Sequence, residues 1–354
     1  MVYFGRVIQS MEEITIKDIA KMCGVGVSTV SRAINNHPDI NPATKQKVME
    51  TIKENGYIPN NSARNLKRTD AKSIAVLVKG MTNPFFSSMI KVMEAEIKRK
   101  KYTMVLHHVD QHEDEVDVAL ELIKEKRLRG IIFLGGYFYH AEEKLEKLHV
   151  PFILSTVGCA PENMSRKQYS SLSVDDEKES YKMVSHLIEQ GHRKIAILCA
   201  DSEDESIGRL RLIGYQRAFE EHGIPVDEEL ICRMKQGIES YSYQNGYVIM
   251  QELIEKRNDF TAVFAISDIL AMGACRAIVE AGKRVPEDIS VAGFDGIEAG
   301  DYYIPTITTI RQPVEEIARA TTQLLFEILA GRQKHQHQIF EGTLLEKEST
   351  MRRV

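Results

Sequence analysis

The chain has 354 residues, of which 43% are hydrophobic and 27% are charged, a composition typical of a folded globular protein and not of a disordered, collagen-like or coiled-coil one. It holds no apolar run near the ~20 residues of a membrane span, and its first residues, MVYFGRVIQSMEE, do not form a signal peptide, so we expect a cytoplasmic protein. Its five cysteines are scattered without a CxxC pair, which argues against disulfides and against a structural zinc site.

The net charge of −5 conceals a basic segment near the amino terminus. Nine Lys or Arg and four Asp or Glu lie between Ile14 and Arg68, so this segment carries +5 and the rest of the chain −10. A compact basic segment on an acidic body favours contact of that segment with a polyanion.

Three short helices are predicted within this segment. Thr15, followed three residues later by Asp18, forms a capping-box pattern at the start of the first helix. The glycine-containing turn at 23–26 ends it, and the second helix is expected from Val27 to Ile34. Asn41-Pro42 then supplies a cap and a first-turn proline for the third helix.

Two short helices joined by such a turn indicate a helix-turn-helix motif. The second helix would present its exposed side chains to the major groove of DNA: Val27, Ser28, Thr29, Ser31 and Arg32. Thr15 and Asn35, at the start of the first helix and the end of the second, complete this predicted DNA-contacting set. From spacing alone, a three-helix bundle without a role in DNA binding stays open.

The next segment, Pro59–Arg68, is polar and basic with a single leucine. Such a segment buries too little apolar surface to fold alone, but it can fold on a partner. A plain solvated linker is the alternative interpretation.

Residues 14–68 resemble the DNA-binding head of the LacI/GalR family of bacterial regulators through TVSRAIN, the GY-P-N step and the A-R-x-L hinge. The resemblance implies that Val27, Ser28 and Arg32 read base edges, and that Thr29 and Ser31 contact phosphates or support the helix. It also places Ala63 and Leu66 in a hinge helix whose leucines open a central base step from the minor groove.

Beyond Thr69, short β-branched runs alternate with amphipathic helices, which predicts an α/β body with two doubly wound parallel sheets; its resemblance to the LacI/GalR family, described below, implies a periplasmic-binding-protein-like fold. The expected strands are Ile74–Val78, Met104–Val109, Ile131–Leu134, Phe152–Leu154, Ile195–Cys199, Ala262–Ile266 and Ile289–Phe294. A break near Ser170–Asp175 separates the two sheets.

Ligands of such folds bind beyond the carboxyl ends of the strands. The residues found there are Phe85, Phe86, Arg211, Ser267, Asp268 and Asp295. A guanidinium group and carboxylates suit sugar hydroxyls, and aromatic rings suit the apolar face of a sugar. Each of these residues taken alone is as readily a helix cap or a core residue.

The body also resembles the LacI/GalR family, in stretches such as IGRLRLIGY and SVAGFDG. The resemblance implies that Arg211 grips effector hydroxyls, that Asp295 and the Phe85-Phe86 pair line the cleft, and that Gln312 lies near it. GFDG in place of GFDD, together with Glu205 and Ile207, weakens a purine-sensing role. A sugar or sugar phosphate is then the favoured effector.

We therefore predict a homodimeric transcriptional regulator, most readily a repressor, that binds a palindromic operator under control of this effector. The alternatives are a global catabolite regulator triggered by a phosphorylated carrier protein, and a sugar-binding or sugar-processing protein without DNA function. No catalytic motif is found, and we expect no cofactor, no resident metal and no membrane partner.

The expected domains are a helix-turn-helix domain at 14–59, a hinge helix and linker at 60–72, and an effector-binding and dimerisation domain at 73–354. Its first lobe is placed at about 73–171 and 312–338, and its second at about 172–304 and 339–354. No heptad repeat follows the last expected strand, Gln338–Leu345, so a dimer is expected rather than a coiled-coil tetramer. Both Met1 and Met11 are candidate starts.

Overall fold

The chain separates into two compact units, Met1–Asp70 and Ala71–Val354. The computed structural model describes residues 14–34, 37–55, 57, 72–137, 142–158, 169–200 and 206–353. None of the helices within these ranges is long and apolar enough to cross a membrane.

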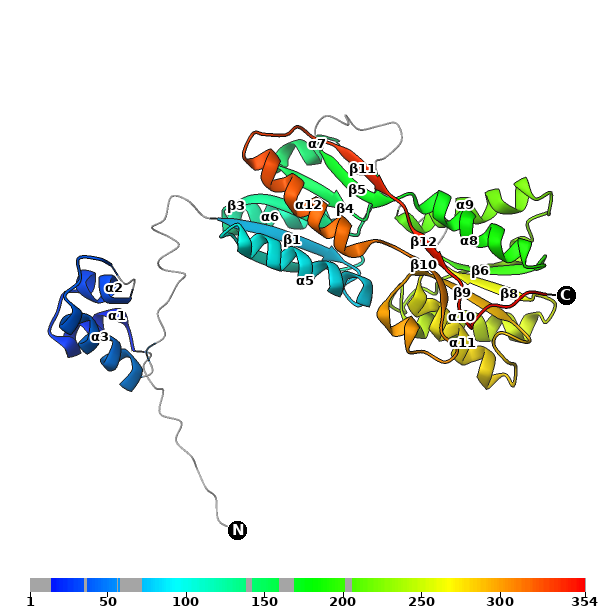
Figure 1. Cartoon of the computed structure of the whole chain (residues 1–354), viewed down its shortest axis with the longest axis horizontal. Helices are drawn as coiled ribbons and strands as arrows, with labels where there is room; N and C mark the ends of the chain where they lie inside the picture. The colour runs from blue at the N-terminus through cyan, green and yellow to red at the C-terminus, as the bar shows by residue number, and fades with distance from the viewer. Residues whose placement is uncertain are drawn as a thin grey trace, which may run out of the picture. The chain divides into compact units, whose positions relative to one another are not determined.

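The described residues of the amino-terminal unit form three helices, α1 (Ile16–Cys23), α2 (Val27–Ile34) and α3 (Pro42–Glu54) (Figure 1). Their fully buried core is formed by Ile19, Val30 and Val48, one residue from each helix. The Thr15 hydroxyl donates to the Asp18 carboxylate at 2.6 Å, which fixes the start of α1. The three helices predicted from capping and turn signals are thus confirmed.

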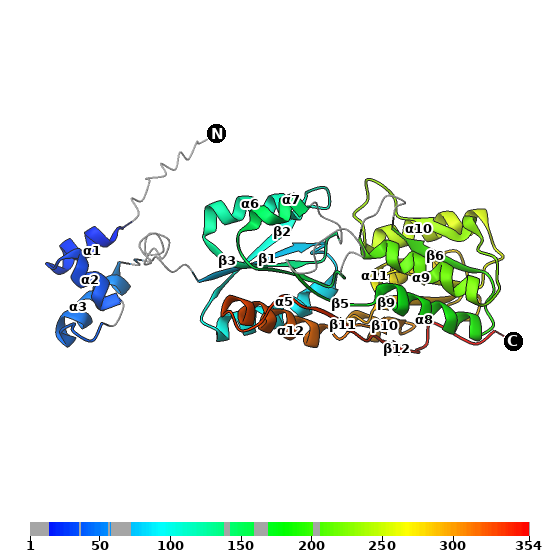
Figure 2. The same cartoon turned by 90° about the horizontal axis from the view of Figure 1, so that it is seen from above.

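The first lobe of the second unit is built on a wholly parallel six-stranded sheet in the order β11-β5-β4-β3-β1-β2. The strands are β1 (Ser73–Lys79), β2 (Thr103–Val109), β3 (Leu128–Leu134), β4 (Phe152–Ser155), β5 (Ser170–Val174) and β11 (His337–Phe340). The helices are α5 (Pro84–Arg99), α6 (Glu115–Lys126), α7 (Glu142–Leu145), followed directly by a 3-10 turn (Glu146–Leu148), and α12 (Val314–Leu329). In Figure 2, α5 and α12 cover one face of the sheet, and α6 and α7 lie over the other.

The second lobe has a six-stranded sheet in the order β12-β10-β9-β8-β6-β7, in which only β12 runs antiparallel to its neighbour. Its strands are β6 (Ile195–Cys199), β7 (Ile231–Arg233), β8 (Ala262–Ala265), β9 (Ser290–Asp295), β10 (Thr308–Arg311) and β12 (Thr343–Leu345). Its helices are α8 (Asp176–Glu189), α9 (Ile207–Glu221), α10 (Tyr243–Lys256) and α11 (Asp268–Glu280), with 3-10 turns at Glu228–Leu230 and Glu298–Asp301. The predicted pair of doubly wound sheets is confirmed.

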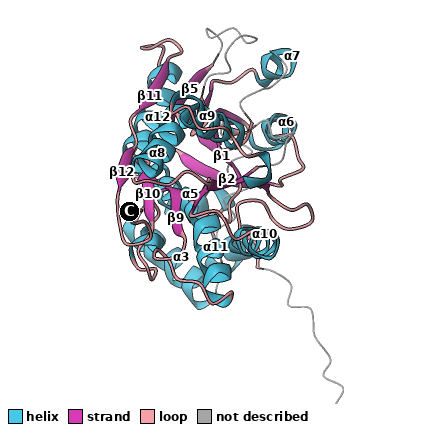
Figure 3. Cartoon of the chain, turned by 90° about the vertical axis from the view of Figure 1, so that its right-hand side faces the viewer, coloured by secondary structure: helices cyan, strands magenta, loops and turns pink. Residues whose placement is uncertain are grey.

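The chain crosses between the lobes three times, from β5 to α8, from β10 to α12 and from β11 to β12. The single last strand expected over Gln338–Leu345 is instead two short strands. β11 pairs with β5 in the first sheet, and β12 pairs with β10 in the second (Figure 3). Gly342 lies between them, where an added side chain would collide with Ile310 and Glu179, so the chain changes sheets at this glycine.

Candidate functional site

The surface of α2 is divided between a buried and an open side. Val30 and Ala33 are buried against the other two helices, whereas Val27, Ser28 and Arg32 are exposed. Val27 is 41% exposed, an unusual placement for an apolar side chain. This is the arrangement that a helix needs in order to reach base edges in the major groove.

The other predicted DNA-contacting residues differ in how exposed they are, and some of them are not described. Thr29 and Ser31 are half-buried on α2, and Thr15 caps α1. Asn35, Ala63 and Leu66 lie outside the described residues, as does most of the predicted hinge at 60–72.

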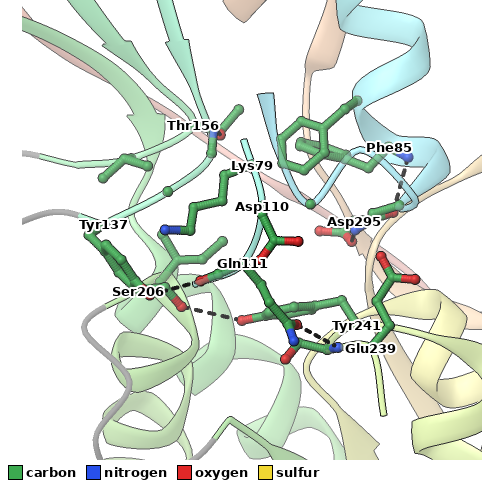
Figure 4. Close-up of a pocket in the computed structure, with 18 of the residues that line it drawn as sticks. Lys79, Phe85, Asp110, Gln111, Tyr137, Thr156, Ser206, Glu239, Tyr241 and Asp295 are labelled. Atoms are coloured by element: carbon green, nitrogen blue, oxygen red, sulfur yellow. Dashed lines mark hydrogen bonds between the residues drawn. The ribbon is translucent and has the colours of Figure 1, made fainter. Parts of the chain in front are cut away.

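A cavity of about 490 Å³ lies between the two lobes of the second unit, at the carboxyl ends of several strands (Figure 4). It is bordered by the segments that follow β1, β2, β3 and β4 of the first lobe, and by the start of α9, the loop before α10 and the end of β9 of the second. Its polar and aromatic lining residues are Lys79, Asn83, Phe85, Phe86, His108, Asp110, Gln111, Tyr137, Thr156, Ser206, Arg211, Glu239, Ser240, Tyr241 and Asp295.

Hydrogen bonds cross the cavity from one lobe to the other. Thr82 Oγ1 donates to Glu239 Oε1 at 2.7 Å, and Asn83 Nδ2 donates to Asp295 Oδ2 at 3.2 Å. An isolated antiparallel bridge joins Tyr137 to Ser206. These contacts hold the two lobes together around the cavity, so a ligand there would bind both lobes at once.

Arg211 forms the centre of a buried ionic network at the second-lobe side of the cavity. Its Nε donates to Asp176 Oδ1 at 2.9 Å, and its Nη1 lies 3.5 Å from Asp295 Oδ1. The guanidinium group lies 3.7 Å from the centre of the Phe294 ring. Burial raises the pKa of Asp176 to about 6 despite the neighbouring Arg211, and burial likewise raises the pKa of Asp295.

Backbone strain is concentrated around the cavity. Of the six described non-glycine residues with positive φ, three line it: Thr156 at +68°, Tyr241 at +50° and Asp295 at +110°. Such conformations cost free energy and persist where the surrounding structure or a function requires them.

Four of the seven residues predicted to bind the effector line this cavity, namely Phe85, Phe86, Arg211 and Asp295. The structure places Ser267, Asp268 and Gln312 outside the lining. Ser267 is the N-cap of α11, and Gln312 Nε2 donates to Asp295 Oδ1 at 2.9 Å from behind the cavity wall.

Asp268 joins buried segments of the second lobe. Its two carboxyl oxygens accept hydrogen bonds from Ile297 N at 2.8 Å and from Thr309 Oγ1 at 2.7 Å. Burial, together with the nearby Asp295, raises the pKa of Asp268 to about 8, so this side chain is mostly protonated at neutral pH.

Sequence reasoning missed the polar lining residues Lys79, Asp110, Gln111, Tyr137, Glu239 and Tyr241. Four of the six, Lys79, Asp110, Gln111 and Tyr137, lie at or just after the carboxyl ends of β1, β2 and β3, where ligand residues are expected in such folds. Glu239 and Tyr241 lie in the loop that precedes α10, which carries no strand signal. Within the described ranges, no group of three His, Cys, Asp or Glu side chains is placed to hold a metal ion.

Comparison with known families and proteins decides the identity of the chain. The family of bacterial regulatory proteins named after lacI matches residues 15–60, and the periplasmic binding protein-like domain matches residues 184–350. The chain is 42% identical over 336 residues to the HTH-type transcriptional regulator MalR of Clostridium butyricum, which covers 94% of this chain and 98% of MalR. The chain belongs to the LacI family of bacterial transcriptional regulators.

Two solved structures of transcriptional regulators resemble the chain over most of its length. A complex of the transcriptional regulator CelR with cellobiose is 28% identical, with a TM-score of 0.68 and coverage of 95% of this chain and 99% of CelR. The lac repressor dimer bound to operator and the anti-inducer ONPF is 25% identical, with a TM-score of 0.72. The match covers 96% of this chain and 100% of the lac repressor chain. Membership of the LacI family makes the chain a transcriptional regulator and not an enzyme.

Proposed function

We propose that this regulator is a repressor whose affinity for a palindromic operator is set by a sugar-class effector in the cavity between the lobes. The observation that carries the proposal is the cavity of about 490 Å³, whose polar wall is shared by two lobes already joined across it by hydrogen bonds. The relative CelR is known in complex with cellobiose, which supports a sugar for the corresponding site of this chain.

The exposed residues Val27, Ser28 and Arg32 would contact base edges of the operator from α2. Leu66 of the predicted hinge helix would enter the minor groove at the central base step. A ligand that contacts both lobes stabilises one relative arrangement of them. It can shift operator affinity only by the difference in its affinity for the two arrangements, on the order of 1–3 kcal/mol per site.

A homodimer is part of the same proposal. Tyr302 and Ile304 are 80% and 91% exposed in a loop that packs on α11 through a hydrogen bond from Tyr303 Oη to Met272 O. Val279 of α11 is also exposed. Large apolar side chains exposed together indicate a protein interface, and a lac repressor relative is known as an operator-bound dimer.

The test is operator binding, measured by fluorescence anisotropy, with sugars and sugar phosphates titrated onto the protein–DNA complex. A repressor with a sugar effector releases palindromic promoter DNA on addition of one member of the panel. Glu239→Ala is the matched variant, because Glu239 is exposed at the cavity wall and its loss leaves the buried ionic network intact. It should still bind the operator but respond differently to the sugar, because it removes a cavity-wall residue and the Thr82 hydrogen bond between the lobes. A complex that ignores every sugar but responds to a phosphorylated carrier protein would assign the chain to catabolite control instead.

A further inference from the structure

We infer that the effector is an uncharged sugar of disaccharide size and that the cavity discriminates against sugar phosphates. This inference rests on the proposed function, because it names the ligand class of the same site. Its basis is the charge around the cavity, where both cations of the described lining are already paired with carboxylates.

The first cation, Lys79, is fully engaged by its neighbours. Its Nζ donates to Glu113 O at 2.6 Å and to Glu115 Oε2 at 3.2 Å, and it lies 3.9 Å from the centre of the Tyr137 ring. The side chains of Lys79 and Glu115 are only 10% and 3% exposed. A phosphate would have to break this partly buried ion pair in order to reach the ammonium group of Lys79, which costs free energy.

The second cation, Arg211, is held in the same way. Its side chain is 2% exposed, and it lies between Asp176 at 2.8 Å and Asp295 at 3.5 Å. One arginine therefore faces two buried carboxyl groups. A third anion at this point would be repelled by both of them.

Further carboxylates reach the cavity without a paired cation among the described lining residues. Asp110 and Glu239 line the cavity from opposite lobes, and Figure 4 shows their side chains among the lining residues. Glu239 accepts a hydrogen bond from Thr82, and Asp110 accepts one from the His112 backbone N–H. Both donors are neutral, so they do not cancel the negative charge of the carboxylates. The summed field around the cavity is therefore negative, and it opposes entry of a dianionic phosphate.

The two helix N-termini at the cavity each carry a capping side chain that occupies one of their free N–H groups. Asn83 Oδ1 accepts from the Phe85 N–H at the start of α5, and Ser206 Oγ accepts from the Gly208 N–H at the start of α9. The amide of Asn83 is turned toward Asp295. The capping side chains thus occupy N–H groups that an anion would otherwise use.

The same walls suit an uncharged sugar. The hydroxyl groups of a sugar can donate to the carboxylates, and the rings of Phe85, Phe86, Tyr137 and Tyr241 offer apolar faces. The volume of about 490 Å³ exceeds what one sugar ring fills. Polar groups are spread over its whole width, from Lys79 and Tyr137 on one side to Asp295 and Glu239 on the other (Figure 4).

The experiment is isothermal titration calorimetry of the full-length protein with glucose, glucose 6-phosphate, a panel of glucosyl disaccharides that includes cellobiose, and the 6′-phosphates of those disaccharides. We expect at least one neutral disaccharide to bind, and its 6′-phosphate to bind at least ~10-fold more weakly, because like charges brought together cost several kcal/mol. A phosphorylated sugar that binds more tightly than its parent, or glucose that binds more tightly than every disaccharide, overturns the inference while leaving the proposed function standing. Binding of no sugar at all overturns the proposed effector class as well.

Glu115→Gln supplies the matched variant. Glutamine retains an oxygen to accept from the Tyr137 N–H, which Glu115 Oε1 does at 2.8 Å, but it releases Lys79 from its carboxylate. The preference for the neutral disaccharide over its 6′-phosphate should narrow by roughly 10-fold or more in this variant. An unchanged preference in a protein that still binds the neutral sugar would show that charge does not set the selectivity. The comparison within the wild-type protein decides the question if the variant does not fold.

Discussion

Arg32 lies on the exposed side of α2, where the guanidinium group is able to form two parallel hydrogen bonds to a guanine edge. We expect Arg32→Ala to weaken operator binding by about 1–3 kcal/mol and to relax the base preference at one operator position. Anisotropy titrations against the operator and against single-base variants of it measure both effects. Lys53→Ala on α3 is the control, since Lys53 is exposed but does not lie on α2. Equal weakening on every DNA sequence would contradict a base-reading role.

Asp268 gives the second lobe a pH dependence of stability. Its pKa in the folded protein is about 8, well above the value of 3.8 for an unburied aspartate. A carboxyl group with a raised pKa favours the folded state below its unfolded pKa, and this contribution is lost as the pH rises from about 4 through about 8. Asp176, with a pKa of about 6, acts in the same direction over a lower range.

We expect the unfolding temperature of Asp268→Asn to exceed that of the wild type by a margin that grows from pH 6 to pH 9, because only part of the contribution of Asp268 is lost at pH 6. The amide resembles the protonated carboxyl group, so it keeps partners for the Ile297 N–H and the Thr309 hydroxyl. Thermal unfolding followed by circular dichroism at both pH values measures the difference. If the difference in unfolding temperature between the two proteins is the same at both pH values, Asp268 is ionised in the folded protein at both of them.

At the scale of elements, the crossing from β11 to β12 depends on a glycine. A Cβ at Gly342 would lie 2.7 Å from Ile310 Cγ2 and 2.9 Å from Glu179 Oε2, and Ile310 is fully buried. We expect Gly342→Ala to lower the free energy of unfolding by about 1–3 kcal/mol through overpacking. Urea denaturation measures it, with Gly158→Ala as control, because a Cβ there meets only Ser173 Oγ at 3.4 Å. Equal free energies of unfolding for the two variants would show that the chain has room for a side chain at residue 342, where it passes from β11 to β12.

The elements that could be predicted from the sequence are those with local signals. The helix from Val27 to Ile34 was defined by a turn before it and asparagines after it, and its predicted bounds match α2. Most strands were visible as apolar runs. The sequence predicts a single strand over 338–345, because no local signal distinguishes a change of sheet at Gly342 from a simple interruption of one strand. The cavity residues Glu239 and Tyr241 could not be found, because only the folded loop brings them opposite Thr82 and Ser206.

At the scale of the whole molecule, the proposed dimer makes a separate prediction. Ile304 is 91% exposed, and an aspartate at this position would place a charge in the proposed interface. We expect Ile304→Asp to be monomeric and to lose operator affinity, since a central interface residue contributes about 2 kcal/mol or more. Sedimentation velocity and anisotropy measure the two effects. Ile213→Asp is the control, because Ile213 is exposed on α9, which packs mainly with α8. A dimeric Ile304→Asp protein would move the interface elsewhere.

The placement of β11 and β12 has a consequence for how the protein is made. These strands are the last of the described chain, and each completes the edge of a different sheet. Until β11 and β12 have been synthesised, β5 and β10 each have a neighbouring strand on one side only. An open edge strand of this kind is prone to pair with other chains. Both sheets therefore stay incomplete until β11 and β12 have been synthesised, and a polypeptide terminated before β11 would expose an open strand edge in each lobe.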